Sequence, residues 1–300
     1  MKEEQMEGTL TQVSAMTEEQ WRKPYGDQRG ASAGKRGPLA VRTQHAELAK
    51  NTLLASLPPN ERERIALHCD IVPLAVGQLL NDSDREGRYV YFPTGGSVAV
   101  TVVLADGVAP EVASVGRNGL LDCAEPGSNE KQVSRAIVKS AGAACRIKAG
   151  MWQREFSHRA CVQQALLIYK QTLMTQLIQI AACNRHHSVQ QRFARWLLTT
   201  FDHARPLMDL PLTQEFMATL LGVRREGITS AAGKLQLDGA IRYKRGNVTL
   251  VDRAALERCA CECYGVIQQH EYDDHSLTVS RPSTRLPAVQ RSRERNSYVS

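Results

Sequence analysis

Basic side chains gather in the C-terminal part of this 300-residue chain. Positions 224 to 245 hold mostly basic charged residues, namely Arg224, Arg225, Lys234, Arg242, Lys244 and Arg245 against Glu226 and Asp238. The whole chain has 38 Lys and Arg against 31 Asp and Glu, a net charge of +7. An excess of this size attracts a partner only where it is concentrated. The basic cluster therefore predicts an anionic polymer as partner.

Cysteine could supply metal ligands near the C-terminus, at Cys259, Cys261 and Cys263. If residues 253–270 form one helix, Cys259 and Cys263 share a face at i, i+4 and Cys261 points away. Metal clusters generally use longer spacings, so we interpret the three as buried small hydrophobes. His186 and His187 are expected to end a helix. We expect no metal ion and no cofactor.

Motifs of several common enzyme classes are absent from the sequence. It contains no G-x-G-x-x-G dinucleotide loop, no phosphate-binding P-loop and no H-E-x-x-H zinc motif. No apolar run reaches the roughly 18 residues of a membrane helix, and the acidic start lacks the apolar region of a signal peptide. We therefore expect a non-enzymatic, cytoplasmic protein with no membrane partner.

Composition and hydrophobic periodicity divide the chain into five segments. Residues 1–44 and the basic residues 274–300 bury too little apolar surface to fold, and we expect both to be disordered. Residues 45–150 begin with helical signals and continue as short β-branched runs separated by turns at Pro93–Gly96 and Asp106–Gly107. These runs predict an antiparallel β-barrel or jelly roll, so the fold class is α+β.

A long helix is predicted in residues 151–185. Its apolar residues step by seven, four and three at Leu166, Leu173, Leu177 and Ile180, while Leu167, Met174 and Ile178 widen the stripe. A stripe of this length favours packing along the whole helix, and we expect a second copy of the chain to cover it in a homodimer. The alternative is that the stripe covers the barrel of its own chain.

Residues 186–273 predict a winged helix-turn-helix. Thr213 can cap a helix with Leu212 and Met217 as a hydrophobic staple, and Gly222 supplies the left-handed conformation of a tight turn. A second helix follows, and then two β runs about an Arg-Gly-Asn turn at residue 245. The alternative is a helical pair that serves only for packing.

Residues 48–273 resemble the Crp/Fnr family of transcription regulators. The resemblance depends on the order of Tyr91–Val100 in the barrel, then Thr213–Glu215, Gly222–Val223, Arg225–Glu226 and Leu237–Ile241 in the C-terminal domain. It implies a dimer that binds double-stranded DNA at a palindromic operator, with RNA polymerase as a further partner if the protein is an activator. The alternative function is a signalling module that responds to a cyclic nucleotide and binds no DNA.

The resemblance also implies roles for residues of the second helix and the wing. Arg225 and Glu226 match the base-reading pair, and Thr229 and Ser230 lie further along the same face, although Ser230 replaces an arginine of the best-known members. Arginine offers a bidentate fork to guanine, and glutamate accepts from cytosine N4. DNA phosphates are assigned to Thr213, Arg224, Lys234, Lys244 and Arg245. Gly227 departs from the family pattern, so the preferred DNA sequence is expected to differ.

The effector of the barrel stays unknown from the sequence. Family members that bind cyclic AMP use an Arg-Ser pair and a Gly-Glu pair, whereas this chain has Gln132-Val133 and Gly116–Asp122 at the matching places. Ser134 and Arg135, in reversed order, are the only candidate effector-pocket residues. We therefore expect that cyclic AMP is not the effector. Residues 1–68 contain no cysteine, which argues against the family's iron–sulfur branch.

Overall fold

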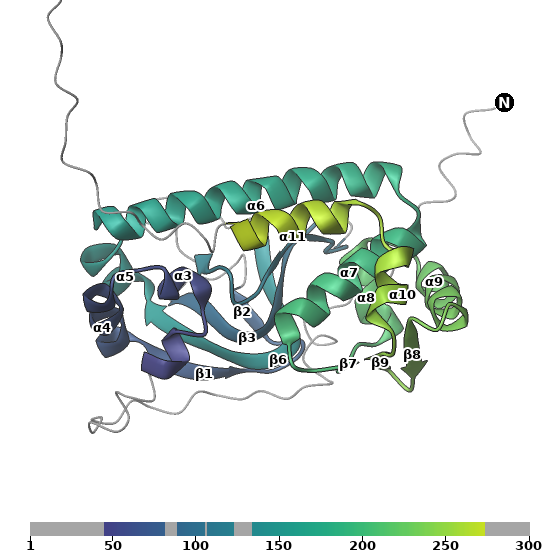
Figure 1. The fold of residues 1–300 in the computed structure, drawn as a ribbon, viewed down its shortest axis with the longest axis horizontal. Coiled ribbons are helices and arrows are strands. Elements are labelled where there is room, and N and C mark those ends of the chain that lie inside the picture. The colour runs from purple at the N-terminus through teal and green to yellow at the C-terminus, as the bar shows by residue number, and fades with distance from the viewer. Residues whose placement is uncertain (1–44, 82–88, 106, 123–133, 274–300) are drawn as a thin grey trace, which may run out of the picture.

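The computed structural model describes residues 45–81, 89–105, 107–122 and 134–273 (Figure 1). The expected leader 1–44 and tail 274–300 lie outside the described residues, and so do Gln132 and Val133. Among the described helices, none is long and apolar enough to cross a membrane.

The N-terminal half is built around a six-stranded antiparallel sheet, as predicted. Its strands run in the order β1-β6-β3-β4, with β2 beside β6 and β5 beside β3. The strands are β1 (Asp70–Leu74), β2 (Leu79–Asn81), β3 (Tyr89–Val102), β4 (Glu111–Val115), β5 (Leu121–Asp122) and β6 (Ser134–Lys148). Each long strand is buried over most of its length, which explains the continuous β-branched and small residues in both.

The turn predicted at Pro93–Gly96 is wrong, because these residues continue through β3 as an irregular part of one strand. Its pairing with β6 shifts register between Pro93 and Val98. Gly96 has φ +83°, and a Cβ there would come within 2.6 Å of the Ser140 carbonyl oxygen. A Cβ on Gly142 would lie 2.1 Å from the Gly95 oxygen. These glycines therefore permit a close crossing of two strands and do not end either one.

Helices α3 (Thr52–Ala55), α4 (Pro59–His68), α5 (Ala149–Glu155) and α6 (Ala160–His186) belong to the same half as this sheet. Pro59 stands at the first position of α4, where its missing N–H costs nothing. Phe92, Trp152 and Phe156 are buried together between the sheet and α5. Helix α6 runs along the whole molecule (Figure 1).

The C-terminal half consists of α7 (Val189–Ala204), β7 (Asp209–Pro211), α8 (Gln214–Leu221), α9 (Arg225–Leu237), β8 (Ile241–Lys244), β9 (Asn247–Leu250), α10 (Arg253–Cys259) and α11 (Cys263–Asp273). Strands β7, β9 and β8 form a small antiparallel sheet. Helix α7 begins with a capping box between Ser188 and Gln191, and every residue from Phe193 to Ala204 is buried.

The two halves share one hydrophobic core. Ala99 of β3 and Ile137 of β6 belong to the same buried cluster as α7, α8 and α9. A polar contact crosses the same boundary: buried Lys139 lies 2.8 Å from the Glu111 carboxylate, and the Trp196 indole N–H donates to the other oxygen of Glu111 at 2.7 Å. The C-terminal half is therefore packed on the sheet through α7.

The apolar residues of the predicted stripe on α6 fall into a buried group and an exposed group. Ile180 is buried by its own chain, on the face that also carries Gln176 and Cys183, and Leu166 packs against the N-terminal core. The exposed apolar residues are Leu167, Met174 and Ile178, which are 69%, 57% and 63% exposed. Leu166, Leu173, Leu177 and Ile180 were the residues predicted for the dimer contact. Ile180 is removed from this set, because α11 and β4 already pack on that side of α6.

Residues 253–270 do not form one continuous helix. Helix α10 ends at Cys259 and α11 begins at Cys263, with a bend between them. Asp202 of α7 holds both pieces: Arg253 of α10 lies 2.8 Å from one carboxylate oxygen, and the Tyr264 hydroxyl of α11 donates to the other at 2.7 Å. Cys261 and Cys263 therefore do not lie on the faces that a continuous helix would give them, although both are buried as predicted.

Candidate nucleic-acid interface

Helix α8 and its turn form as the local sequence predicts. The Thr213 hydroxyl accepts from the Phe216 N–H at 3.2 Å, and Leu212 and Met217 are both fully buried beside this cap. Gly222 ends the helix at φ +61° and ψ +42°. Val223 donates its N–H to the Ala218 carbonyl, which closes the turn. The corner fixes how α9 leaves α8.

Helix α9 presents the predicted reading residues to the outside. It begins at Arg225, with Arg224 as its N-cap. Ile228, Ala231, Ala232 and Leu235 are buried on one face. The opposite face exposes Arg225, Glu226, Thr229 and Ser230. The structure therefore brings all four predicted base-reading residues onto one exposed face.

Two hydrogen bonds help to orient side chains on this face. Gln214 of α8 places its side-chain oxygen 3.5 Å from Arg225 Nε, so it helps to orient the guanidinium. The Thr229 hydroxyl donates to the Arg225 carbonyl at 3.1 Å within the helix. Sequence reasoning missed Gln214, and its position at the start of the preceding helix was the signal that could have found it.

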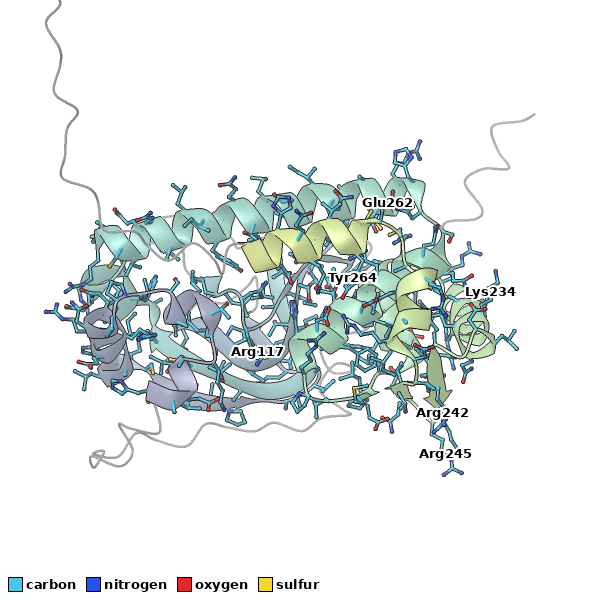
Figure 2. The ribbon with its side chains drawn as sticks, viewed as in Figure 1. Arg117, Lys234, Arg242, Arg245, Glu262 and Tyr264 are labelled. Carbon is cyan, nitrogen blue, oxygen red and sulfur yellow. The ribbon has the colours of Figure 1, made fainter. Side chains whose placement is uncertain are left out.

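The wing carries a further group of exposed cations. Strands β8 and β9 meet at Arg245 and Gly246, whose φ angles of +51° and +80° give the tight turn of a two-residue hairpin. Lys244 and Arg245 are exposed, as is Arg242, which the sequence analysis counted in the basic cluster without assigning it a contact. Figure 2 shows Lys234, Arg242 and Arg245 projecting from the same end of the molecule.

The predicted phosphate-binding residues are all exposed at this end. Arg224 and Lys234 belong to α9, and Thr213 caps α8 with an exposed side chain. The Thr213 oxygen is already an acceptor for its own helix, so toward a phosphate it retains only its hydroxyl proton. Cations from α9 and from the wing thus surround the exposed face of α9.

The candidate effector residues lie at the first end of an inner strand of the sheet. Ser134 and Arg135 begin β6, opposite Val102 and Thr101 of β3, and both are half-buried. Residues 123–133, which precede them, lie outside the described part. The structure therefore describes no complete pocket around this pair.

The loop at residues 116–120, which replaces the family's Gly-Glu segment, is covered by helices. The Tyr169 hydroxyl of α6 donates to the Leu120 carbonyl at 2.8 Å. A Cβ on Gly119 would come within 2.4 Å of the Tyr169 ring, and one on Gly116 within 2.4 Å of the His203 ring of α7. Both helices therefore pack closely on this loop.

An antiparallel sheet joined through a long helix to a winged helix-turn-helix defines a class of DNA-binding regulators. Residues 191–259 match the family described as the Crp-like helix-turn-helix domain. The chain accordingly has the Crp-type DNA-binding domain and the fold of Crp/Fnr regulators, and the resemblance seen in the sequence is confirmed.

Solved structures show the same fold over most of the described chain. A regulator of the Crp/Fnr family from Eubacterium rectale is 16% identical, with a TM-score of 0.54 over 69% of this chain and 96% of its own. FixK2 from Bradyrhizobium japonicum is 15% identical, with a TM-score of 0.53 over 64% and 98%. TTHB099 from Thermus thermophilus, a CRP-family regulator, is 22% identical, with a TM-score of 0.51 over 63% and 96%. A search of curated proteins finds no sequence match.

Proposed function

We propose that the protein is a homodimeric transcription regulator that binds a palindromic DNA operator through α9 and the wing. The observation that carries this proposal is the exposed face of α9 at Arg225, Glu226, Thr229 and Ser230, surrounded by exposed cations. A helix of this kind enters the major groove, where base edges are distinguishable. A helix pair that served only for packing would not need charged residues on its outward face.

The contacts divide into two kinds. Arg225 and Glu226 are assigned to base edges, because a guanidinium fork fits guanine and a carboxylate accepts from cytosine. Arg224, Lys234, Lys244, Arg245 and the Thr213 hydroxyl are assigned to phosphates, which position the protein without reading sequence. Arg242 joins this second group, since it projects from the same end of the molecule (Figure 2).

The exposed stripe of Leu167, Met174 and Ile178 is the surface proposed for the second copy. Three large apolar side chains in a row on one helix face are costly in water and are typical of a helix–helix contact. Leu173 and Leu177 are half-buried beside this stripe and would flank the seam. A two-fold axis along α6 would then place two recognition helices on one face of the DNA.

Selection from a random duplex pool, read by mobility shift, tests the proposal. The enriched sequences should contain two inverted half-sites about one DNA turn apart, roughly 34 Å. RNA polymerase becomes a further partner if transcription from such an operator rises. Failure to enrich any sequence, together with binding of a cyclic nucleotide, would instead support a signalling module that binds no DNA.

A further inference from the structure

Three cysteines and one histidine come together where the long helix meets the C-terminal helix. Cys183 lies near the end of α6, His187 follows that helix directly, and Cys261 and Cys263 lie at the bend between α10 and α11. The three sulfur atoms and one ring nitrogen of His187 all lie within 4.8 Å of one another. The break between α10 and α11 is what turns Cys261 and Cys263 toward Cys183.

We propose that Cys183, His187, Cys261 and Cys263 form a tetrahedral Zn²⁺ site. Three thiolates and one imidazole are a common donor set of structural zinc sites. Zinc bonds of about 2.3 Å to sulfur and about 2.0–2.1 Å to nitrogen place neighbouring ligand atoms roughly 3.6–3.8 Å apart in a tetrahedron. Here Cys183 Sγ and Cys261 Sγ lie 3.5 Å apart, and Cys263 Sγ lies 3.5 Å from His187 Nδ1. These two distances are close to the tetrahedral spacing, and all four donors lie within 4.8 Å of one another.

Groups around the donors are arranged as they are around bound zinc. His187 directs Nδ1 at the sulfur atoms, while its Nε2 lies 3.2 Å from the Glu262 carboxylate, an arrangement that fixes the ring and its tautomer. The Gln179 amide donates to Cys263 Sγ at 3.1 Å. Figure 2 shows Glu262 at the end of α6, where α11 begins. The residue that holds the histidine therefore lies between two of the cysteine ligands in the sequence.

The charge around the cluster also fits a metal–thiolate centre. Three thiolates with one Zn²⁺ and a neutral imidazole carry a net charge of −1. Arg195 of α7 is buried, and its positive charge acts on Cys183. An arginine stays charged when buried and needs a negative partner there.

Zinc at this place would tie together segments that are far apart in the sequence. Two ligands come from the end of α6 and the residue after it, just before α7 starts at Val189. The other two ligands come after the winged helix, at the start of α11, which lies along α6 (Figure 1). A metal would therefore hold the DNA-binding half at a set position against the long helix. This inference does not depend on whether the protein binds DNA.

Metal content and Co²⁺ titration of the full chain test the site. Protein purified with reductant in the absence of oxygen should contain one zinc per chain, and the metal-free form should bind one Co²⁺ with the visible bands of tetrahedral cobalt and the near-ultraviolet band of thiolate ligation. Zinc should also protect three cysteines from alkylation. Chelation should lower the melting temperature, because a structural metal contributes to folding.

Cys259 provides a matched control only two residues from the cluster. It lies outside the cluster, with its thiol 3.4 Å from an Asp238 oxygen. Cys261→Ser and Cys263→Ser should lose stoichiometric zinc and the cobalt bands, whereas Cys259→Ser should retain both. The alkylation test uses the unaltered protein, so it decides the matter even if a variant fails to fold.

Two results would overturn the zinc site. The first is reduced full-length protein that takes up neither Zn²⁺ nor Co²⁺. The second is a Cys183–Cys261 disulfide in the protein as isolated, with no metal present, which would make the cluster a redox pair. Loss of metal in Cys259→Ser to the same extent as in Cys261→Ser would equally contradict the assignment of ligands.

Discussion

Arg225 stands at the start of α9 with its side chain exposed and oriented by Gln214. Its fork can satisfy two acceptors of one guanine at once, which a shorter or apolar side chain cannot do. For this reason the proposed function assigns Arg225 to base reading and the cations of the wing to phosphates.

Arg225→Ala should cost about 1–3 kcal/mol of binding at one base pair per half-site and relax the preference there. Competition titrations against operators changed at single positions measure this. Lys244→Ala is the matched control: it should weaken all sequences about equally and reduce the salt slope by about one ion. Equal weakening of every sequence by Arg225→Ala would remove that residue from base reading.

Lys139 is the other residue whose chemistry is set by its surroundings. It is fully buried, and burial lowers its pKa, while the neighbouring Glu111 carboxylate opposes that shift. The Trp196 indole completes the group, with the Lys139 ammonium 5.0 Å from the ring centroid. The ion pair and the indole together join the sheet to α7, so a change here acts on both halves.

Lys139→Met should destabilise the protein by about 3–5 kcal/mol, because it leaves the buried Glu111 carboxylate without its counter-charge. Chemical denaturation followed by circular dichroism measures the loss. Lys148→Met, at an exposed position of the same strand, should change stability by no more than about 0.5 kcal/mol. Adding Glu111→Gln to Lys139→Met should recover part of the loss, and a double variant less stable than the single one would contradict this account.

At the scale of elements, α6 has two apolar faces, one buried within the chain and one exposed. One face, with Val162, Ala165, Ile180 and Cys183, is buried within the chain, and the other exposes Leu167, Met174 and Ile178. A substitution on the first face tests folding, while one on the second tests assembly. The two faces are interleaved in the sequence, and only their burial separates them.

The double change Met174→Glu and Ile178→Glu should give folded monomers, because charged residues facing each other across the seam repel while neither position is part of the chain's own core. Sedimentation and operator titration measure the result. Operator affinity should fall by about 10²-fold or more, since the second half-site no longer binds within one complex. Leu67→Glu, at an exposed apolar position of α4, is the control and should remain dimeric. An unchanged dimer in the double variant would place the interface elsewhere.

At the scale of the whole molecule, the N-terminal sheet and the DNA-binding half are one packed unit. The shared core around α7 and the helices on the loop at 116–120 connect any event in the sheet to the position of α9. An effector would have to act through these contacts.

Cyclic AMP should not act as that effector. Its phosphate needs charge-assisted donors when it leaves water, and its ribose needs an acceptor. At the positions that match the family's motifs, the chain has neither the Arg-Ser order nor the Gly-Glu pair. The Leu120 carbonyl of the corresponding loop already accepts from Tyr169. Calorimetry should detect no micromolar binding, and operator affinity should not respond to added cyclic AMP. Micromolar binding coupled to tighter operator binding would contradict this prediction.

Local rules determined the helix-turn-helix from the sequence alone. The cap at Thr213, the left-handed Gly222 and the hairpin turn at Arg245 and Gly246 each act within a few residues, so their signals are readable without the rest of the chain. The reading residues of α9 came instead from the resemblance to the Crp/Fnr family.

Tertiary packing decided what local rules could not. Pro93–Gly96 looks like a turn, yet pairing along β6 keeps it within a strand. The bend after Cys259 contains no glycine or proline, so the local sequence gives no signal for it. The contacts of Asp202 of α7 with Arg253 and Tyr264 fix the two helices on either side of the bend. The four sulfur and nitrogen donors come from two regions that lie 74 residues apart in the sequence, His187 to Cys261. Their proximity depends on how α11 packs along α6. The spacing of residues within either region does not predict that packing.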